Sequence, residues 1–219
     1  MDIKVITTND GSKSLFLPGM NETYHSKFGA ITESEHVYIK SGLAQLNINK
    51  INILEIGFGT GLNVLLSWLA VQDKPVEIYY ESLEKYPLSL KLIPELNFFS
   101  DPDKRSLFEK IHQVPWQKVT ALTPRFRLLK NQVDLSLYHT NQKFDLVYFD
   151  AFAPDKQPEL WTSQIFEKIF GLMNPSGILV TYSAKGRVRR TMQAAGFKVE
   201  RLPGPPGKRE MLRAIKPLT

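Results

Sequence analysis

The 219-residue chain carries a net charge of +6 and is 42% hydrophobic and 23% charged, which is typical of a folded globular protein. It contains no cysteine, which excludes a disulfide framework and a thiolate metal site. Its apolar runs are far shorter than the roughly 20 residues of a membrane-spanning helix, and its first residues lack the pattern of a signal peptide. We therefore expect a cytoplasmic protein that binds neither a membrane nor a metal.

The first 30 residues differ in character from the rest and predict a small β extension. Two short apolar segments flank a polar stretch in which Asp10 and Gly11 form a typical hairpin turn. We expect an N-terminal β-hairpin extension over residues 1–30 and one larger domain over residues 31–219.

From Ile31 onward, helix-like and strand-like segments alternate. Helices are predicted over residues 32–46 with Thr32 or Ser34 as N-cap, 62–72, 87–96, a segment ending near 116, 162–173 capped by Thr162 or Ser163, and 187–196 closed by Gly196. Strands are predicted over residues 51–58, 75–84, 126–131, 133–139, 143–150, 177–183, 197–202 and 209–215. Such alternation predicts a parallel sheet with helices on both faces.

The last two strands are joined only by residues 203–208, which are too few for the crossover that parallel strands need. They must therefore form an antiparallel hairpin. The predicted fold is an α/β, Rossmann-like, mostly parallel doubly wound sheet with an antiparallel C-terminal hairpin.

Three glycines, Gly57, Gly59 and Gly61, lie between the first sheet strand and its helix. Glycines here allow a tight turn and a close approach of the backbone to a ligand. Leu62 stands near the place where the NAD fingerprint needs a small residue, and no Lys-Ser or Lys-Thr pair follows as in a P-loop. The pattern favours a nucleoside with little or no phosphate, the alternative being a simple tight turn.

An acid follows this loop at the end of the second strand. Glu84 lies about 25 residues after the loop, near the spacing at which a carboxylate accepts ribose hydroxyls. Glu81 is the competing candidate, and a solvated glutamate is the alternative for either residue.

Together these features resemble the class I S-adenosylmethionine-dependent methyltransferases. The resemblance implies S-adenosyl-L-methionine as the cofactor, whereas the spacing alone indicates only a nucleoside. It implies that the cofactor is bound by Glu55, Gly57, Phe58, Gly59, Gly61, Asn63, Glu84, Lys85 and Asp150.

The segment from Leu146 to Trp161 is an apolar strand that ends in a carboxylate, Asp150. In the class I methyltransferase fold this strand delivers its last side chain beside the donor methyl group, so the resemblance places Asp150 where the acceptor must come. A carboxylate suits an amine, because it attracts the ammonium form, orients the nitrogen and takes up a proton as the neutral amine attacks. Phe152 and Trp161 are predicted either as aromatic walls for a planar base or as core packing.

Longer motifs resemble a more specific family. Residues 55–63 (EIGFGTGLN), 149–161 (FDAFAPDKQPELW) and 207–212 (GKREML) are similar to the methyltransferases that complete 5-methylaminomethyl-2-thiouridine at the tRNA wobble position, known as stand-alone MnmD and as the methyltransferase domain of MnmC. That family methylates the amine of 5-aminomethyl-2-thiouridine. The resemblance implies that Asp150 and Phe152 are catalytic and face this amine.

The chain departs from the family pattern at two positions. Gln157 precedes Pro158 where the family commonly has asparagine. The family also carries Gly-Asp after the strand that precedes the aspartate strand, and this acid contacts the adenine amine. Here His139 and Thr140 are found instead, so His139 is the candidate cofactor contact at this position.

The positive charge is concentrated at the C-terminal end, where residues 176–219 contain 10 Lys or Arg and 2 Asp or Glu. Such a patch either is a solvated face or binds polyphosphate. With the resemblance, it predicts contacts to the anticodon stem-loop of tRNA, which should weaken with salt. The candidate substrate residues are Trp161, Ser183, Lys185, Gly186, Arg187, Arg189, Arg190, Lys208, Arg209 and Glu210.

The bifunctional relatives carry a flavin-dependent oxidase after the methyltransferase. Because this chain ends at Thr219, we expect no oxidase domain and an aminomethyl substrate made elsewhere. We also expect a monomer. Two alternatives stay open. One is a small-amine transferase resembling the spermidine synthases, which share the glycine loop, the ribose acid and an aspartate-bearing strand. The other is a non-catalytic RNA-binding protein on a methyltransferase fold.

Overall fold

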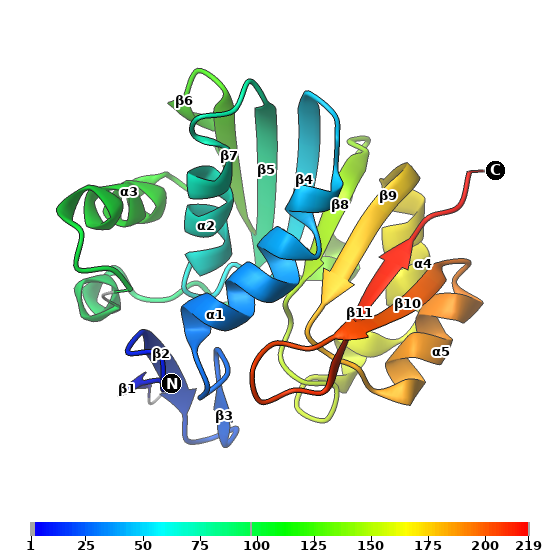
Figure 1. Ribbon diagram of the computed structural model, residues 1–219, viewed down its shortest axis with the longest axis horizontal. Helices are drawn as coiled ribbons and strands as arrows, with labels where there is room; N and C mark the ends of the chain where they lie inside the picture. The colour runs from blue at the N-terminus through cyan, green and yellow to red at the C-terminus, as the bar shows by residue number, and fades with distance from the viewer. Residues whose placement is uncertain (1–2, 97, 219) are drawn as a thin grey trace.

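An eight-stranded sheet forms the centre of the computed structural model, which describes residues 3–96 and 98–218 (Figure 1). Its strands are, in spatial order, β10 (Lys198–Pro203), β11 (Glu210–Ile215), β9 (Met173–Thr181), β8 (Phe144–Phe149), β4 (Lys50–Ile56), β5 (Glu77–Glu84), β7 (Phe126–Gln132) and β6 (Thr120–Thr123). Strands β9, β8, β4, β5 and β7 run parallel, and β11 runs antiparallel to β9 and β10. The predicted sheet with its antiparallel C-terminal hairpin is confirmed.

The other edge of the sheet also ends in an antiparallel strand. This strand, β6, pairs with β7 and was not predicted from the sequence. Only Leu122 of its four residues is buried, so the short edge strand carries almost no apolar pattern. Short edge strands of this kind are common, because they leave few unpaired backbone N–H and C=O groups with which a strand of another chain could pair.

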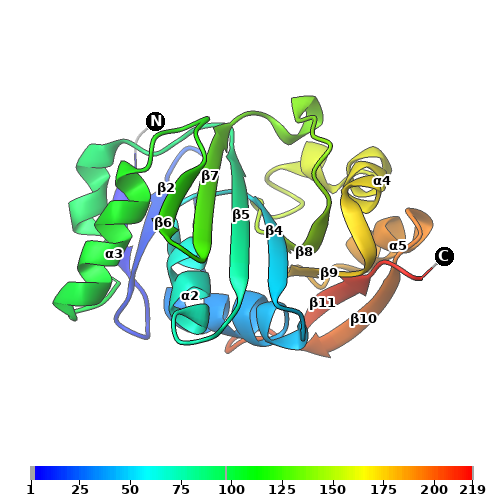
Figure 2. The same cartoon turned by 90° about the horizontal axis from the view of Figure 1, so that it is seen from above.

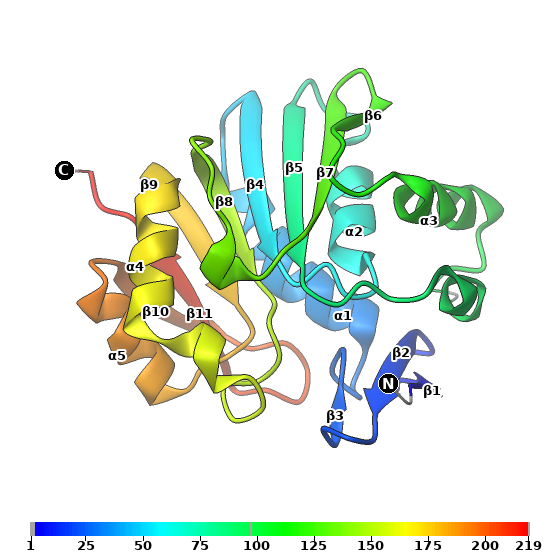
Figure 3. The ribbon, with the colours of Figure 1, turned by 180° about the vertical axis from the view of Figure 1, so that it is seen from behind.

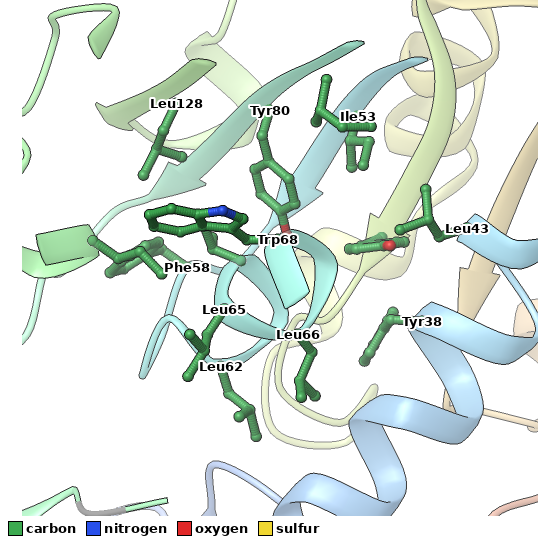
Figure 4. Close-up of a cluster of buried hydrophobic side chains, with 14 of the residues drawn as sticks. Tyr38, Leu43, Ile53, Phe58, Leu62, Leu65, Leu66, Trp68, Tyr80 and Leu128 are labelled. Atoms are coloured by element: carbon green, nitrogen blue, oxygen red, sulfur yellow. The ribbon is translucent and has the colours of Figure 1, made fainter. Parts of the chain in front are cut away.

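Helices cover both faces of the sheet (Figures 2 and 3). One face carries α1 (Ala30–Ser34), the π-helical segment η1 (Glu35–Lys40), α2 (Leu62–Val71) and α3 (Pro102–Gln113), and the other carries α4 (Ser163–Leu172) and α5 (Gly186–Ala194). Each face has its own cluster of buried apolar side chains, and Figure 4 shows part of the first. In β4, Ile53 belongs to the first cluster and Leu54 to the second, because successive side chains of a strand point to opposite faces.

A separate three-stranded antiparallel sheet precedes the main one. It consists of β1 (Lys4–Thr7), β2 (Lys13–Leu17) and β3 (Glu22–Thr23). The predicted hairpin is confirmed: Gly11 has a φ of +81°, and the Asp10 carboxylate accepts hydrogen bonds from the Ser12 N–H and hydroxyl. The strand β3 extends it, while the domain boundary at residue 30 stays a prediction.

The helix predicted over residues 32–46 exists but changes form along its length. It begins at Ala30 after Gly29, so neither Thr32 nor Ser34 is its N-cap, and it continues as the π-helical segment η1. The segment predicted as this helix ends in a separate 3₁₀ turn, η2 (Leu43–Gln45). By contrast, Thr162 caps α4 and Gly196 closes α5 as predicted.

Two other predicted elements were wrong in type. Of the residues 87–96 predicted as a helix, only Leu90–Glu95 are helical, and they form a 3₁₀ helix, η3, that starts after the capping residue Ser89. Residues 133–139 are not a strand, because Asp134 accepts hydrogen bonds from the Ser136 N–H and hydroxyl and starts a 3₁₀ turn, η4 (Leu135–Leu137).

Two classes of feature are absent from residues 3–96 and 98–218. No helix there is long and apolar enough to cross a membrane. In the same ranges, no group of three or more histidine, aspartate or glutamate side chains is arranged to hold a metal ion.

Candidate active site

A cleft of about 980 Å³ opens at the carboxyl ends of the parallel strands, the edge at which such sheets bind ligands. Its walls come from the N-terminal sheet, from the loops after β4, β5 and β7, and from the loop after β8. The structure brings nine of the predicted residues together here: Gly57, Phe58, Gly59, Asn63, Glu84, Lys85, Asp150, Phe152 and Lys208.

The glycine loop takes a conformation that side chains would hinder. Gly57, Gly59 and Gly61 have φ values of +94°, +49° and +74°, in the left-handed region that L residues rarely adopt. A Cβ on Gly57 would lie 2.7 Å from the carbonyl oxygen of Asp150, which is backbone and cannot move aside. The loop therefore approaches the strand that carries Asp150 as closely as backbone allows.

The structure separates the two acids at the end of β5. Glu84 lies in the wall of the cleft, where its Oε2 accepts the Gly59 N–H at 3.1 Å and its Oε1 accepts the Tyr86 N–H at 2.8 Å. Glu81 is buried elsewhere and accepts hydrogen bonds from Tyr138 and Asn131. Of the two, only Glu84 is placed to meet a ligand.

Glu55 is not brought into the cleft. It is fully buried under the loop, where its Oε2 accepts the Ser82 hydroxyl at 2.5 Å. Burial raises the pKa of Glu55 to about 8, so its carboxyl is mainly protonated at neutral pH. Glu55 is therefore placed to support the glycine loop from below, and it does not face a ligand in the cleft.

Asp150 follows the last residue of β8, and its carboxylate is held from two sides. Tyr38 donates its hydroxyl to Oδ1 at 2.5 Å, and Asn63 donates its side-chain amide to Oδ2 at 2.8 Å. Burial raises the pKa of Asp150 to about 6, while the two hydrogen bonds oppose this rise. Asp150 is therefore a base that is mainly ionised at neutral pH yet close to its titration point.

The loop after Asp150 is fixed by hydrogen bonds to its backbone. Trp161 is buried and donates its Nε1–H to the carbonyl oxygen of Phe152 at 2.9 Å, and Tyr182 donates its hydroxyl to that of Ala151 at 2.8 Å. The Phe152 ring meets the edge of the Tyr24 ring with 5.2 Å between centroids. Phe152 thus lies in the cleft, whereas Trp161 supports it from behind.

The predicted contact at His139 is corrected by the position of the chain after β7. His139 is exposed and lies outside the cleft wall, which instead contains Val133, Asp134 and Leu135. Asp134 also pairs with Lys85 at 2.9 Å, and hydrogen bonds from Ser136 lower the pKa of Asp134 to about 2. An ionised acid therefore follows the strand before the aspartate strand, where the family pattern has one.

The basic residues of the C-terminal segment are not equivalent. Lys185 and Arg187 pair with Asp155 in the loop after β8. Lys208 reaches into the cleft, where it pairs with Glu33 and lies over the Tyr182 ring at 4.1 Å from its centroid. Among the remaining candidates, Ser183 is buried, Gly186 and Glu210 are half-buried, Arg189 is half-buried with its Nε atom enclosed, and Arg190 and Arg209 are exposed.

Several cleft residues were missed by sequence reasoning because they come from the N-terminal segment. The Tyr24 ring lies between the glycine loop and Phe152, so that a Cβ on Gly59 would be 3.2 Å from it. His25 is within hydrogen-bonding distance of Thr60 in the loop, at 3.2 Å. Neither residue belongs to a motif, and no local pattern reports a contact across such a sequence separation.

The residues present fit a cofactor that contains a nucleoside. The backbone of Gly57 and Gly59 lines the cleft, Glu84 accepts the Gly59 N–H beside it, and the cleft has the size of a small-molecule site.

The sheet order, the glycine loop after β4 and the acid at the end of β5 define a Rossmann-like class I methyltransferase. The model of one such family, described as S-adenosyl-L-methionine-dependent methyltransferase, matches residues 105–217, just over half of the chain. The chain belongs to this family, and S-adenosyl-L-methionine is its cofactor.

Curated relatives are similar over most of the chain. The bifunctional protein MnmC of tRNA 5-methylaminomethyl-2-thiouridine biosynthesis from Pseudomonas syringae pv. tomato is 33% identical over 88% of this chain and 32% of its own length. The protein of the same description from Cupriavidus metallidurans is 29% identical over 94% of this chain and 33% of its own. The chain thus spans about a third of the length of the curated relatives it matches.

Solved structures are also similar over most of the chain. MnmC2 from Aquifex aeolicus is 29% identical, with a TM-score of 0.81 over 97% of this chain and 70% of its own. Spermidine synthase from Thermotoga maritima has a TM-score of 0.60 over 98% of this chain and 68% of its own. At 14% identity, the second likeness shows a shared fold only.

Proposed function

We propose that this protein transfers a methyl group from S-adenosyl-L-methionine to the amine of 5-aminomethyl-2-thiouridine at the wobble position of tRNA, giving 5-methylaminomethyl-2-thiouridine. The observation that carries the proposal is the position of Asp150, an acid that lines the cleft and whose backbone lies directly beside Gly57 of the glycine loop. The names of the curated relatives and of the Aquifex structure support the choice of substrate.

On the donor side, we assign the cofactor to residues of the three loops. The backbone of Gly57 and Gly59 lines its binding site. The Glu84 carboxylate accepts hydrogen bonds from its ribose hydroxyls, and the Asp134 carboxylate accepts a hydrogen bond from its adenine amine. When bound, S-adenosyl-L-methionine supplies an electrophilic methyl group on a sulfonium. Transfer from a sulfonium needs positioning of the acceptor more than chemical activation.

On the acceptor side, Asp150 receives the substrate amine. Its carboxylate attracts the ammonium form, takes up one proton and leaves the nitrogen lone pair free to attack. Phe152 lines the same cleft, where its ring contacts the planar base. A wobble base can enter such a cleft because it is unpaired in the free anticodon loop.

Exposed cations of the C-terminal segment suit the phosphates that flank the wobble base. Arg190 and Arg209 are exposed, and Arg209 directly follows Lys208, which lines the cleft. We infer that they contact the anticodon stem-loop, and that the protein acts as a monomer in the cytoplasm. The absence of an acid at His139 and Thr140 would favour the alternative of a non-catalytic RNA-binding protein. Asp134 in the cleft wall speaks against that alternative, because it offers an acid for the adenine amine.

The test is methyl transfer from labelled S-adenosyl-L-methionine to tRNA from cells that lack the modification. We expect 5-methylaminomethyl-2-thiouridine in the digest, and a loss of about 10²-fold to 10⁴-fold in kcat/KM for Asp150→Asn. Asp73→Asn, which changes an exposed carboxylate after α2, is the matched control. Methylation of putrescine or aminopropyl transfer in place of tRNA methylation would refute the proposal.

A further inference from the structure

A buried tyrosine that does not line the cleft donates a hydrogen bond to Asp150. Tyr38 belongs to the π-helical segment η1, a helix type often found at functional sites, and only 1% of its surface is exposed. Its hydroxyl donates to Oδ1 of Asp150 at 2.5 Å, and its ring packs on Tyr148 with 5.1 Å between centroids. Figure 4 shows Tyr38 on its helix at the edge of the apolar cluster beside α2.

The second carboxylate oxygen has a donor of its own. The Asn63 side-chain amide reaches Oδ2 at 2.8 Å from the first turn of α2. With one donor on each oxygen, the plane of the carboxylate is fixed by two elements, η1 and α2. The remaining acceptor positions of Asp150 are left for a ligand, because the residue lines the cleft.

The hydroxyl also influences the charge of Asp150. Burial raises the pKa of Asp150 and the negative charge of Glu33 adds to the rise, whereas the hydrogen bonds from Tyr38 and Asn63 and the positive charge of Lys208 oppose it. Other ionisable groups near this carboxylate are Glu55, Tyr80 and Tyr182, which are themselves uncharged at neutral pH because burial raises their pKa values. Among the opposing influences, the Tyr38 hydrogen bond is the largest.

We propose that Tyr38 is a positioning residue for methyl transfer, whose hydroxyl holds the Asp150 carboxylate in the orientation and the ionised form that the acceptor amine requires. This inference rests on the proposed function. The ammonium group of the substrate gives one proton to Asp150. Its nitrogen lone pair then forms the new C–N bond while the methyl–sulfur bond breaks with its electron pair going to sulfur. Asp150 afterwards releases the proton to solvent.

The test compares Tyr38→Phe with Tyr148→Phe. Both substitutions remove one buried hydroxyl from the same cluster, but the Tyr148 hydroxyl is paired with Ser67 at 3.1 Å and not with Asp150. We expect Tyr38→Phe to lower kcat about 10-fold to 100-fold, since it removes a hydrogen bond to a charged group. The KM for S-adenosyl-L-methionine should stay within about 2-fold, as should all constants of Tyr148→Phe.

The pH profile separates positioning from a merely structural role. Because the hydroxyl lowers the pKa of Asp150, its removal raises that pKa, and the acidic limb of kcat/KM should move to higher pH in Tyr38→Phe only. Unchanged kcat and an unmoved limb in a folded Tyr38→Phe would overturn the inference, as would equal effects in Tyr148→Phe.

A measurement that needs no substrate tests the role of Tyr38 independently of the proposed function. The titration of Asp150 can be followed by NMR of ¹³C-labelled aspartate, with its signal assigned by Asp150→Asn. A higher pKa in Tyr38→Phe than in the parent and in Tyr148→Phe supports the inference even where the parent fails to methylate tRNA. An Asp150 titration equal in all three would overturn it.

Discussion

Asp134 lies in the cleft wall because β7 ends at Gln132 and the next residues turn into a 3₁₀ helix. Its carboxylate is ionised and held in place by Ser136 and Lys85. An acid held in this way accepts a hydrogen bond from a ligand amine without reorganising. Asp134 is therefore the residue that we assign to the adenine.

Replacing this acid should weaken the cofactor more than the chemistry. We expect Asp134→Asn to raise the KM for S-adenosyl-L-methionine about 10-fold, the cost of one hydrogen bond to a charged group, with kcat nearly unchanged. Steady-state kinetics and calorimetry of cofactor binding measure this. Glu167→Gln, on the exposed side of α4, serves as control. Equal cofactor affinity in Asp134→Asn and the parent would contradict the assignment.

The positions of single site residues could be predicted where these residues belong to a recognisable sequence motif. Asp150 and Glu84 end apolar strands, so their position at the edge of the sheet follows from the strand itself. Asp134 was missed because the alternating apolar residues of 133–139 predicted a strand that includes it. In the structure its side chain instead caps a 3₁₀ turn. Tyr38 was missed as a site residue because it reads as core, and its hydroxyl meets Asp150 across 112 positions of the chain.

The N-terminal sheet and the loop after β8 close the cleft together. Lys156 of that loop donates to the carbonyl oxygen of Met20 at 2.7 Å, and Tyr24 meets Phe152 edge to face. The first 30 residues thus contribute to the site, although the sequence indicated only a hairpin. Elements with a strong period were predicted well, whereas η1, η3 and the short β6 depend on tertiary contacts that no local pattern encodes.

We expect Tyr24→Ala to reduce kcat/KM for tRNA about 3-fold to 10-fold, because it removes the edge contact that holds the Phe152 ring. Methyl-transfer kinetics provide the measurement, and thermal unfolding shows whether the sheet stays folded. Lys13→Ala, on β2 and outside the cleft wall, is the control from the same sheet. Activity of Tyr24→Ala equal to that of this control would show that the ring does not position Phe152.

At the scale of the whole molecule, the positive charge gathers on the segment that borders the acceptor side of the cleft. Part of it is engaged by acids: Arg201 pairs with Glu210 and Arg213 with Glu200, in addition to the pairs of Lys185 and Arg187 with Asp155. The exposed cations Arg190 and Arg209 are therefore the better candidates for phosphate contacts.

Binding of tRNA should weaken steeply with salt, since bound phosphates release counterions. We expect Arg190→Ala and Arg209→Ala each to reduce the slope of log K against log salt concentration by about 1. Lys50→Ala, at the amino end of β4 and far along the strand from the cleft, should leave the slope unchanged. Filter binding or fluorescence anisotropy at several salt concentrations measures the slopes, and equal slopes in all variants would exclude these contacts.

The pairing of β4 with β8 fixes the position of Asp150 relative to the glycine loop. Ile56 and Phe149 are register partners, and the Asp150 N–H donates to the Ile56 carbonyl oxygen at 3.0 Å. The residues that follow, Gly57 and Asp150, begin the donor and acceptor sides, so these sides start about one strand spacing, roughly 4.8 Å, apart. The backbone hydrogen bonds between β4 and β8 thus keep the donor side and the acceptor side at a fixed spacing. Because this spacing rests on backbone hydrogen bonds, substitutions in the surrounding loops can change the shape of the acceptor side without changing it.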